Sequence, residues 1–356
     1  MSNGIANITR NLNTAVDMMP ALKNARILVT GGAGFIGSSL VRQLLKEDVA
    51  EVVVYDNFVR GRQSNIQDAL QDERCRIFEH GGDIRDTDVL DEAVKGMDYV
   101  FHLAAMWLLH CRDYPRTAFE VNIRGTYNVL EACVNNGVKK LVFSSSASVY
   151  GDAQQVPMTE DHPFNNRNFY GATKISGESM CRAIYDRYGL DYVGLRYMNV
   201  YGPHQDQQSA YSGVIPLVLN RVDRGEAPVV NGDGTQAYDF VYVDDVARAN
   251  MLAAVAGVSD RFYNVGTGVQ TTIKELCHTI LEMKGSNLEV SYKPYPPEDA
   301  RQLVKNRIGS TRRAREELGF VHRYNLRSGL QKLIEWREES SNDPTMADHS
   351  NKLRRE

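Results

Sequence analysis

A short apolar strand that runs into a glycine-rich turn constrains this chain more than any other feature of its sequence. Residues 26–30 are rich in apolar and β-branched side chains, and they lead through Gly31, Gly34 and Gly37 into a helical pattern over residues 38–46. In such a strand–turn–helix unit, glycines let the backbone approach a pyrophosphate, which the helix N-terminus then binds. The spacing is G-x-x-G-x-x-G, and a glycine turn alone is weak evidence because many tight turns contain glycine.

The next strand-like run ends in an acidic residue at an informative distance. Residues 52–55 are apolar and lead into Asp56, 19 residues beyond Gly37. A carboxylate there can accept hydrogen bonds from both hydroxyls of an adenosine ribose and repels a 2′-phosphate. Asp56 therefore favours NAD over NADP, although Arg60 and Arg62 lie just beyond it and argue the other way.

A further strand-like run ends near Glu79, and Asp83-Ile84 follows a Gly-Gly turn. The carboxylate of Asp83 can accept a hydrogen bond from an adenine amine. It can equally cap a helix that starts near Asp86, because aspartate is a preferred N-cap residue. The sequence leaves both interpretations open.

Strand-like runs alternate with helical patterns from residue 25 to about residue 200. This alternation predicts an α/β fold with a Rossmann-type, doubly wound parallel sheet covered on both faces. We expect residues 25–200 to form a dinucleotide-binding domain. Its further strands are expected at residues 99–103, 140–144 and 192–197, and its longer helices at residues 114–135 and 169–188.

After Tyr201, prolines and glycines separate shorter elements. We interpret residues 201–336 as a smaller substrate-binding lobe laid over the carboxyl ends of the strands, where ligands bind in such sheets. Residues 239–243 and 262–265 look like strands that return to the main sheet, so the region 237–267 belongs partly to the first domain. The two ends are expected to form a polar arm and a charged tail, residues 1–24 and 337–356.

Composition excludes several classes of function. The formal net charge of −4 over 356 residues argues against a dedicated nucleic-acid binder. No apolar run approaches the roughly 18 residues that cross a bilayer, and residues 1–23 lack the apolar core of a signal peptide. The five cysteines are scattered without a C-x-x-C pair, which suits a reducing cytoplasm. The eight histidines show no metal-ligand spacing, so no metal site is expected.

Tyr170 and Lys174 are the candidate catalytic pair. The apolar spacing of the residues that follow predicts a helix, on which residues four apart share a face. A free tyrosine has a pKa of about 10, and a nearby cation favours its phenolate, which can then act as a general base. Tyr-x-x-x-Lys alone is a weak signal, because a surface tyrosine beside a solvated lysine gives the same pattern.

Several further motifs accompany this pair in a characteristic order. With them, the chain resembles the extended short-chain dehydrogenases/reductases of the nucleotide-sugar epimerase/dehydratase family, from Gly31 to about Phe320. The matching stretches besides the glycines and the Tyr170/Lys174 pair are Phe101-His102-Leu103-Ala104-Ala105, Asn122, residues 144–151 (Ser-Ser-Ser-Ala-Ser-Val-Tyr-Gly), residues 196–203 (Arg-Tyr-Met-Asn-Val-Tyr-Gly-Pro) and residues 239–245 (Asp-Phe-Val-Tyr-Val-Asp-Asp).

The resemblance implies roles for individual residues. Tyr170 is the general base, and Lys174 lowers its pKa and binds the nicotinamide ribose. Ser146 hydrogen-bonds the reacting oxygen, although a serine there can also simply cap a turn. Asn122 ties down the backbone of the active site. The cofactor is NAD, and the implied contacts besides Tyr170 and Lys174 are Gly31, Gly34, Phe35, Ile36, Asp56, Asn57, Asp83, Ile84, Leu103, Ala104, Ala105, Asn122, Ser144 and Tyr197.

The residues after Ser146 bear on the reaction outcome. Related dehydratases carry Asp-Glu there and decarboxylating relatives a glutamate at the second position, whereas this chain has Ala147-Ser148. The motif is most similar to that of the 4-epimerases, so we expect reversible 4-epimerisation of a UDP-hexose, N-acetylhexosamine or hexuronate. The alternatives are a UDP-hexuronate decarboxylase, a one-way keto-sugar reductase and a non-catalytic nucleotide sensor.

Two departures from the family pattern fall in the expected substrate site. Relatives usually carry arginine where this chain has Tyr238, so another cation should bind the diphosphate. Arg301 and Arg307 are the candidates, although both can be ordinary surface arginines. Trp107 stands where lysine is common and either shapes the sugar pocket or belongs to an apolar lining. Asn199 is the expected diphosphate contact, and the nucleotide is expected against residues 209–211 and 214–216, Val214 among them.

Quaternary structure and pathway follow only from the resemblance. The apolar-striped helices that contain residues 121–133 and 175–188 resemble those of the family's dimer interface. We therefore expect a homodimer, although the helices can also serve only to cover the sheet. Supply of precursors for polysaccharides or glycoconjugates fits the family.

Overall fold

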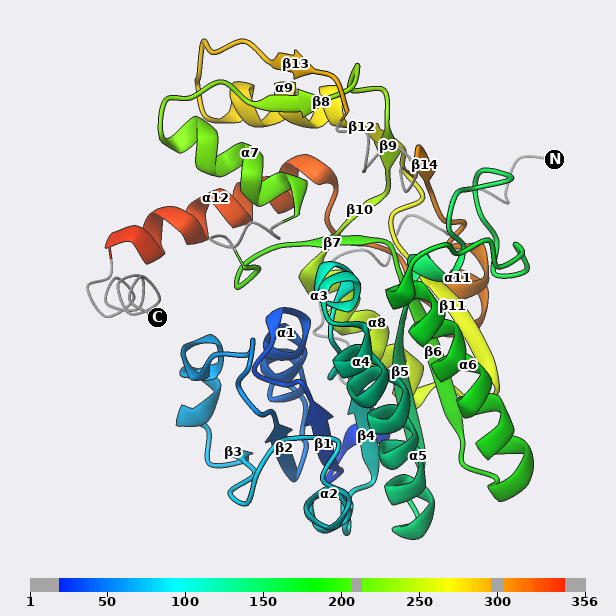
Figure 1. Cartoon of the computed structure of the whole chain (residues 1–356). Helices are drawn as coiled ribbons and strands as arrows, with labels where there is room; N and C mark the ends of the chain where they lie inside the picture. The colour runs from blue at the N-terminus through cyan, green and yellow to red at the C-terminus, as the bar shows by residue number, and fades with distance from the viewer. Residues whose placement is uncertain (1–18, 207–212, 296–303, 343–356) are drawn as a thin grey trace, which may run out of the picture.

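Seven parallel strands form the central sheet (Figure 1). The computed structural model describes residues 19–206, 213–295 and 304–342. The strands, in spatial order, are β3 (Cys75–Ile77), β2 (Glu51–Tyr55), β1 (Arg26–Thr30), β4 (Tyr99–His102), β5 (Lys140–Ser146), β6 (Tyr192–Tyr197) and β11 (Arg261–Val265). The order reverses between β1 and β4, and ligands of such sheets bind beyond the carboxyl ends at this point. The α/β, doubly wound prediction is confirmed.

Alternate residues of each strand face different helical layers. Ile27 and Val29 of β1 join a core with α1 (Phe35–Leu44), α8 (Val243–Val255) and α11 (Arg312–Leu318). Leu28 and Val53 join a second core with α2 (Thr87–Val94), α5 (Gly125–Asn135) and α6 (Phe169–Tyr188). Because both faces are covered, the strands are near-continuous apolar runs, which is why they could be found in the sequence.

The helical prediction for residues 114–135 is confirmed in extent, but the segment is not a single α-helix. The chain instead forms α4 (Pro115–Ala118), a π-helical turn (Phe119–Arg124) and then α5. The wider turn contains Asn122, whose side chain is buried and bonded to a neighbouring loop. Single π-helical turns inside α-helices often occur at functional sites.

The remaining elements form a smaller lobe beyond the sheet, at the top of Figure 1. Helices α7 (Val214–Asp223), α9 (Ile273–Met283) and α12 (Leu326–Asn342) pack around a third core that includes Leu219, Leu276 and Leu330. Strands β8 (Val229–Asn231) and β13 (Ser291–Lys293) pair. Strand β9 (Ala237–Tyr238) lies between β12 (Thr271–Thr272) and β14 (Asn306–Arg307).

One of the two expected returning strands belongs to the main sheet. Residues 262–265 lie in β11 beside β6, as predicted. Residues 239–243 do not: β10 (Phe240–Tyr242) pairs only with β7 (Asn199–Tyr201) in a separate two-stranded sheet. Strand β7 follows β6 as a separate strand and is the partner of β10. Strand β10 has only three residues and ends where α8 begins. At the C-terminal end, α12 continues to Asn342, into the segment predicted as a charged tail.

From the sequence we expect neither a membrane-spanning segment nor a metal site. Within the described ranges, no helix is both long and apolar enough to cross a membrane. The same residues contain no group of three or more His, Cys, Asp and Glu side chains arranged to hold a metal ion.

Candidate active site

The glycine turn lies between β1 and α1, at the point where the strand order reverses. Gly31 has a left-handed φ of 71°, and a Cβ added there would lie 2.8 Å from the backbone nitrogen of Ala104. A Cβ on Gly37 would collide with the Gly31 carbonyl oxygen. Helix α1 begins at Phe35, so Phe35 and Ile36 present backbone N–H groups from its first turn, where no earlier helical carbonyl is available. The turn is therefore open to a phosphate.

Asp56 is fixed at the end of β2. Its carboxylate accepts hydrogen bonds from the backbone nitrogens of Ala33 (3.0 Å) and Phe58 (2.9 Å), and Gly61 packs against it. Burial raises the pKa of this carboxyl, which the two N–H donors partly offset. The side chain thus ties the glycine turn to the loop that follows β2, and its remaining acceptor capacity suits a ribose diol.

Asp83 does not cap the next helix. Helix α2 has Asp86 as its N-cap residue, and the Asp83 carboxylate instead pairs with Arg85 at 2.6 Å. This hydrogen-bonded pairing lowers the pKa of Asp83, with a smaller contribution from Asn57. Ile84 is buried next to it, and its carbonyl accepts from Asn128. The cap interpretation is wrong, and contact with adenine stays a prediction.

The loop after β4 passes close to the glycine turn. Leu103 and Ala105 are half-buried there, and the backbone nitrogen of Ala104 donates to Thr30 Oγ1 at 3.3 Å. Thr30 Oγ1 also hydrogen-bonds His102 Nδ1 at 2.8 Å. Sequence reasoning missed Thr30, for which the only signal was a polar residue at the end of an apolar strand.

Asn122 links three parts of the site. Its Oδ1 accepts from the backbone nitrogen of Met106 (2.7 Å), and its Nδ2 donates to the Met106 carbonyl (2.8 Å) and to Thr173 Oγ1 (3.1 Å). The π-helical turn, the loop after β4 and helix α6 are joined by one side chain. Asn122 therefore ties down the backbone as the sequence predicted, whereas its cofactor contact stays a prediction.

Tyr170 and Lys174 lie in the first two turns of α6. Asn168 caps this helix, and its Oδ1 accepts from Gly171 N at 2.8 Å. Lys174 Nζ donates to the Ser144 carbonyl at 2.7 Å and lies 5.7 Å from the centroid of the Tyr170 ring. Burial lowers the pKa of Lys174 to about 8.

The phenol of Tyr170 has a raised pKa. Burial raises it to about 12, while hydrogen bonding to Ser146 and the charge of Arg307 lower it in part. Lys174 is not among the groups that lower the pKa of Tyr170 in this structure. Ser146 Oγ also accepts from Ser148 N at 3.1 Å, so this serine both caps a turn and faces the phenol.

Ser144 and Tyr197 use their hydroxyls within the protein. The Ser144 hydroxyl hydrogen-bonds the Tyr197 hydroxyl at 2.9 Å, and the latter reaches Asn250 Oδ1 at 2.9 Å. All three residues are buried. Sequence reasoning missed Asn250, because it lies on α8 far along the chain. Direct cofactor contact by Tyr197 stays a prediction.

The expected substrate residues gather on β7, β9 and β14. Asn199 Nδ2 donates to the Asp239 carbonyl (3.2 Å), and Asp239 N donates to the Arg307 carbonyl (3.0 Å). Tyr238 is the register partner of Arg307, and its hydroxyl donates to the Val304 carbonyl at 2.9 Å. This donor, expected for the substrate, is thus bound within the protein.

Arg307 has an unusual environment. Its Nε is fully buried without a hydrogen-bond partner, and no acid in the described ranges forms an ion pair with it. Burial lowers its pKa, which Tyr238, Tyr170 and Asp152 partly oppose. Arg307 is half-buried, and because its guanidinium has no counter-ion among the described residues, it is suited to an anionic ligand.

The other residues predicted to bind the substrate lie on different loops and helices. Trp107 precedes α3 (Leu108–Asp113), its ring lies under the guanidinium of Arg60, and it is half-buried. Val214 is the first residue of α7. Arg301 and the segment 209–211 lie outside the described residues.

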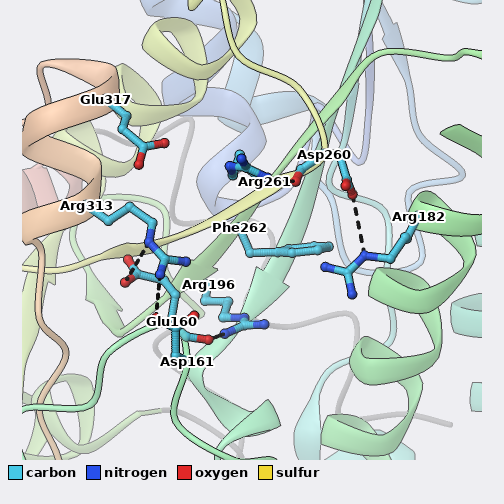
Figure 2. Close-up of a pocket in the computed structure, with 9 residues that line it drawn as sticks. All are labelled: Glu160, Asp161, Arg182, Arg196, Asp260, Arg261, Phe262, Arg313 and Glu317. Atoms are coloured by element: carbon cyan, nitrogen blue, oxygen red, sulfur yellow. Dashed lines mark hydrogen bonds and ion pairs between the residues drawn. The ribbon is translucent and has the colours of Figure 1, made fainter. Parts of the chain in front are cut away.

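A charged cleft of about 440 Å³ lies beside β11, outside this site (Figure 2). The figure shows Arg313 paired with Asp161 (2.6 Å) and Arg182 with Asp260 (3.5 Å). Arg196 in its wall forms a buried ion pair of 2.7 Å with Glu178. None of the predicted catalytic or cofactor residues lines this cleft, and its charges largely pair with one another.

Comparison with known proteins identifies the family. The sequence model of the NAD dependent epimerase/dehydratase family matches residues 27–266. The chain belongs to this family. A UDP-glucose 4-epimerase of Mycolicibacterium smegmatis is 35% identical over 319 residues, which cover 87% of this chain and 98% of that protein.

Two solved structures support the same assignment to the epimerase/dehydratase family. The UDP-N-acetylglucosamine 4-epimerase from Methanobrevibacter ruminantium, in complex with UDP-N-acetylmuramic acid, is 34% identical with a TM-score of 0.83, over 89% of this chain and 99% of that one. The UDP-glucose 4-epimerase from Thermotoga maritima, with UDP-glucose, is 35% identical with a TM-score of 0.81, over the same shares of the two chains.

NAD is the cofactor of this epimerase/dehydratase member, and its residues fit the group. The turn from Gly31 to Gly37 leaves space that a Cβ would fill, and it lies at the N-terminus of α1. Asp56 supplies an acceptor at the end of β2. These features match the needs of a pyrophosphate and an adenosine ribose.

Proposed function

We propose that this protein is an NAD-dependent nucleotide-sugar 4-epimerase acting on a UDP-hexose or a UDP-N-acetylhexosamine, the sugar classes of its structural relatives. The observation that carries the proposal is the grouping of Ser146, Tyr170 and Lys174 where the end of β5 meets the start of α6. The two positions that follow Ser146 support it further. Ala147 and Ser148 are buried in a 3-10 turn (Ala147–Val149) and offer neither a carboxylic acid nor a carboxylate base for dehydration or decarboxylation.

The roles of these residues follow from their geometry. Tyr170 takes the proton from the C4 hydroxyl while Ser146 holds the same oxygen. NAD⁺, when bound, would supply the acceptor and then the donor for the C4 hydride, so that the hydride could return to the opposite face of the 4-keto sugar. Tyr170 then gives its proton back to the C4 oxygen, so no proton or electron is gained or lost over a cycle. Lys174 holds the nicotinamide ribose from a position fixed by the Ser144 carbonyl.

The raised pKa of Tyr170 must be offset for this step, since a base works best near the working pH. Arg307 supplies one positive charge for this purpose, and Lys174 and the nicotinamide ring would add two more once NAD⁺ is bound. Arg307 already lowers the pKa of Tyr170 in the structure. Its charge therefore contributes to the base as well as to substrate binding.

We assign the diphosphate to Arg307 and Asn199. They lie on either side of Asp239, whose backbone bonds to both, at the carboxyl-terminal side of the sheet. A phosphate there would neutralise the charge of the half-buried Arg307. Charge-assisted hydrogen bonds of this kind contribute about 1.5–3 kcal/mol each.

Proton NMR of the purified enzyme with UDP-sugars and no added reductant tests the proposal. The panel contains UDP-glucose, UDP-N-acetylglucosamine, UDP-glucuronate and their C4 epimers. We expect one pair to reach an equilibrium mixture of C4 epimers, and Tyr170→Phe to abolish the exchange. A pentose formed from UDP-glucuronate would instead establish a decarboxylase, and no change in any sugar would contradict catalysis on UDP-sugars.

We further propose that the protein is a homodimer in the cytoplasm that supplies glycoconjugate precursors. Tyr127 of α5 and Tyr188 of α6 have 41% and 54% of their surface exposed, which supports an interface on these helices. All five cysteines are buried and unpaired, which suits a reducing compartment. Light scattering that gives a monomer mass at micromolar concentration would contradict the dimer.

A further inference from the structure

Three loops that follow different strands meet at Arg60. Arg60 lies in the loop after β2, Trp107 follows β4, and Asp206 follows β7 of the smaller lobe. The guanidinium carbon of Arg60 is 4.7 Å from the centroid of the Trp107 ring, and its Nη2 is 3.6 Å from Asp206 Oδ2. We call this arrangement of Arg60, Trp107 and Asp206 the Arg60 bridge.

Sheet order shows what the bridge crosses. Strand β1 lies between β2 and β4, so a contact between the loops after β2 and β4 passes across the carboxyl end of β1. The glycine turn begins at that end. Asp56 and Ala104, which flank the turn, lie four residues before Arg60 and three before Trp107 along the chain. The bridge is thus built on the two loops that border the dinucleotide site.

Asp206 extends the bridge to the second part of the molecule. The ion pair joins the loop of the ribose-binding acid to the chain that leads into the smaller lobe. Both side chains are partly exposed, at 38% and 29%. An ion pair in this setting is weakened by salt, whereas the contact between guanidinium and indole depends less on ionic strength.

We propose that the Arg60 bridge closes the mouth of the dinucleotide site and retains NAD on the enzyme between turnovers. This inference rests on the proposed function, because an epimerase regenerates its NAD in every cycle and gains nothing by releasing it. The position of Arg60 also explains why an arginine four residues after Asp56 does not mark an NADP enzyme. Its guanidinium is held by Trp107 and Asp206 rather than placed beside the acid.

The test is the rate of NAD release from NAD-loaded enzyme without sugar. After rapid dilution, NAD in the filtrate is measured over time for the wild type, Arg60→Ala, Asp206→Asn and Trp107→Phe. Arg62→Ala is the matched control, since Arg62 is an exposed arginine of the same loop. We expect release to be about tenfold faster in Arg60→Ala, by the loss of a stacked cation and its ion pair, faster by a smaller factor in Trp107→Phe, because a phenyl ring attracts a cation less strongly than an indole, and unchanged in Arg62→Ala.

Salt provides the second readout. Release from the wild type should accelerate between low and high salt, whereas release from Arg60→Ala and Asp206→Asn should respond less. Thermal melting of each variant reports whether it is folded. Wild-type release rates in both folded Arg60→Ala and folded Asp206→Asn would overturn the bridge. Because no sugar is present, this result would leave the epimerase proposal intact, whereas a wild type that shows no bound NAD would contradict both.

Discussion

Arg307 and Tyr238 are register partners on the adjacent parallel strands β14 and β9. Partners of this kind lie about 4.8 Å apart with their side chains on the same face. In this pair the tyrosine hydroxyl is bound to the Val304 carbonyl, and the arginine Nε is buried without a partner. At Tyr238, where the family resemblance leads us to expect an arginine, the chain therefore has a guanidinium on the neighbouring strand.

The first prediction is that Arg307 supplies the missing positive charge for the substrate. Arg307→Ala should raise KM for the nucleotide sugar about ten- to hundredfold, because a charge-assisted hydrogen bond to a phosphate is lost. Steady-state kinetics at fixed pH would measure this change. The double exchange Tyr238→Arg with Arg307→Tyr should recover part of the affinity.

Tyr238→Phe is the matched control for that series. It removes only the hydroxyl that donates to Val304, so KM should stay near the wild-type value while the free energy of unfolding falls by about 1 kcal/mol. If Arg307→Ala left KM unchanged, the diphosphate would have to be bound elsewhere.

The second prediction concerns Lys174 and the pH dependence of stability. Its pKa in the folded protein is about 8, below the value of about 10.4 for a free lysine. At pH 7 the folded state thus holds a buried charge at a cost of about 3 kcal/mol, and this cost decreases as the pH rises from about 8 to about 10. Replacing Lys174 by Met also loses a hydrogen bond to Ser144, which offsets about 1 kcal/mol.

Lys174→Met should therefore be inactive and yet more stable than the wild type at pH 7. Thermal unfolding at pH 7 and pH 9.5 measures the effect, and the difference should be smaller at the higher pH. A variant less stable than the wild type at pH 7 would show that the ammonium is stabilised rather than strained by its environment.

The third prediction is that Asp56 determines the choice of cofactor. Removal of its carboxylate in Asp56→Gly should weaken NAD binding about tenfold or more and reduce the discrimination against NADP. Fluorescence titration with NADH and NADPH gives both dissociation constants. Equal loss of affinity for the two cofactors would mean that Asp56 only holds the glycine turn, through Ala33.

The sequence predicted those elements whose pattern is local. Strands β1 and β6 and helix α6 have the predicted bounds, because buried parallel strands are apolar runs and Asn168 caps α6 from the adjacent position. What it could not predict depends on contacts between distant segments. The π-helical turn at Asn122 and the separate pairing of β10 are of this kind.

The same distinction applies to the site. Tyr170, Lys174 and Ser146 were found because they form local motifs, and the structure brings them together. Their electrostatics were not predictable, since the Ser144 carbonyl that binds Lys174 and the Arg307 charge that acts on Tyr170 come from other elements. The hydrogen bond of the Tyr238 hydroxyl likewise depends on a distant residue, Val304, which lies two positions before β14.

The fourth prediction distinguishes the two polar atoms of Asn122. Asn122→Ala loses bonds to Met106 and Thr173 and leaves a buried carbonyl and N–H without partners, which should cost about 2–4 kcal/mol of unfolding free energy. Asn122→Asp keeps the acceptor for Met106 N but places a second oxygen against the Met106 carbonyl. It should be at least as destabilising as Asn122→Ala at pH 8 and recover as the pH falls and the carboxyl is protonated. Urea unfolding at pH 5 and pH 8 measures both, and an Asn122→Asp variant as stable as the wild type at pH 8 would contradict the observed hydrogen-bond pattern.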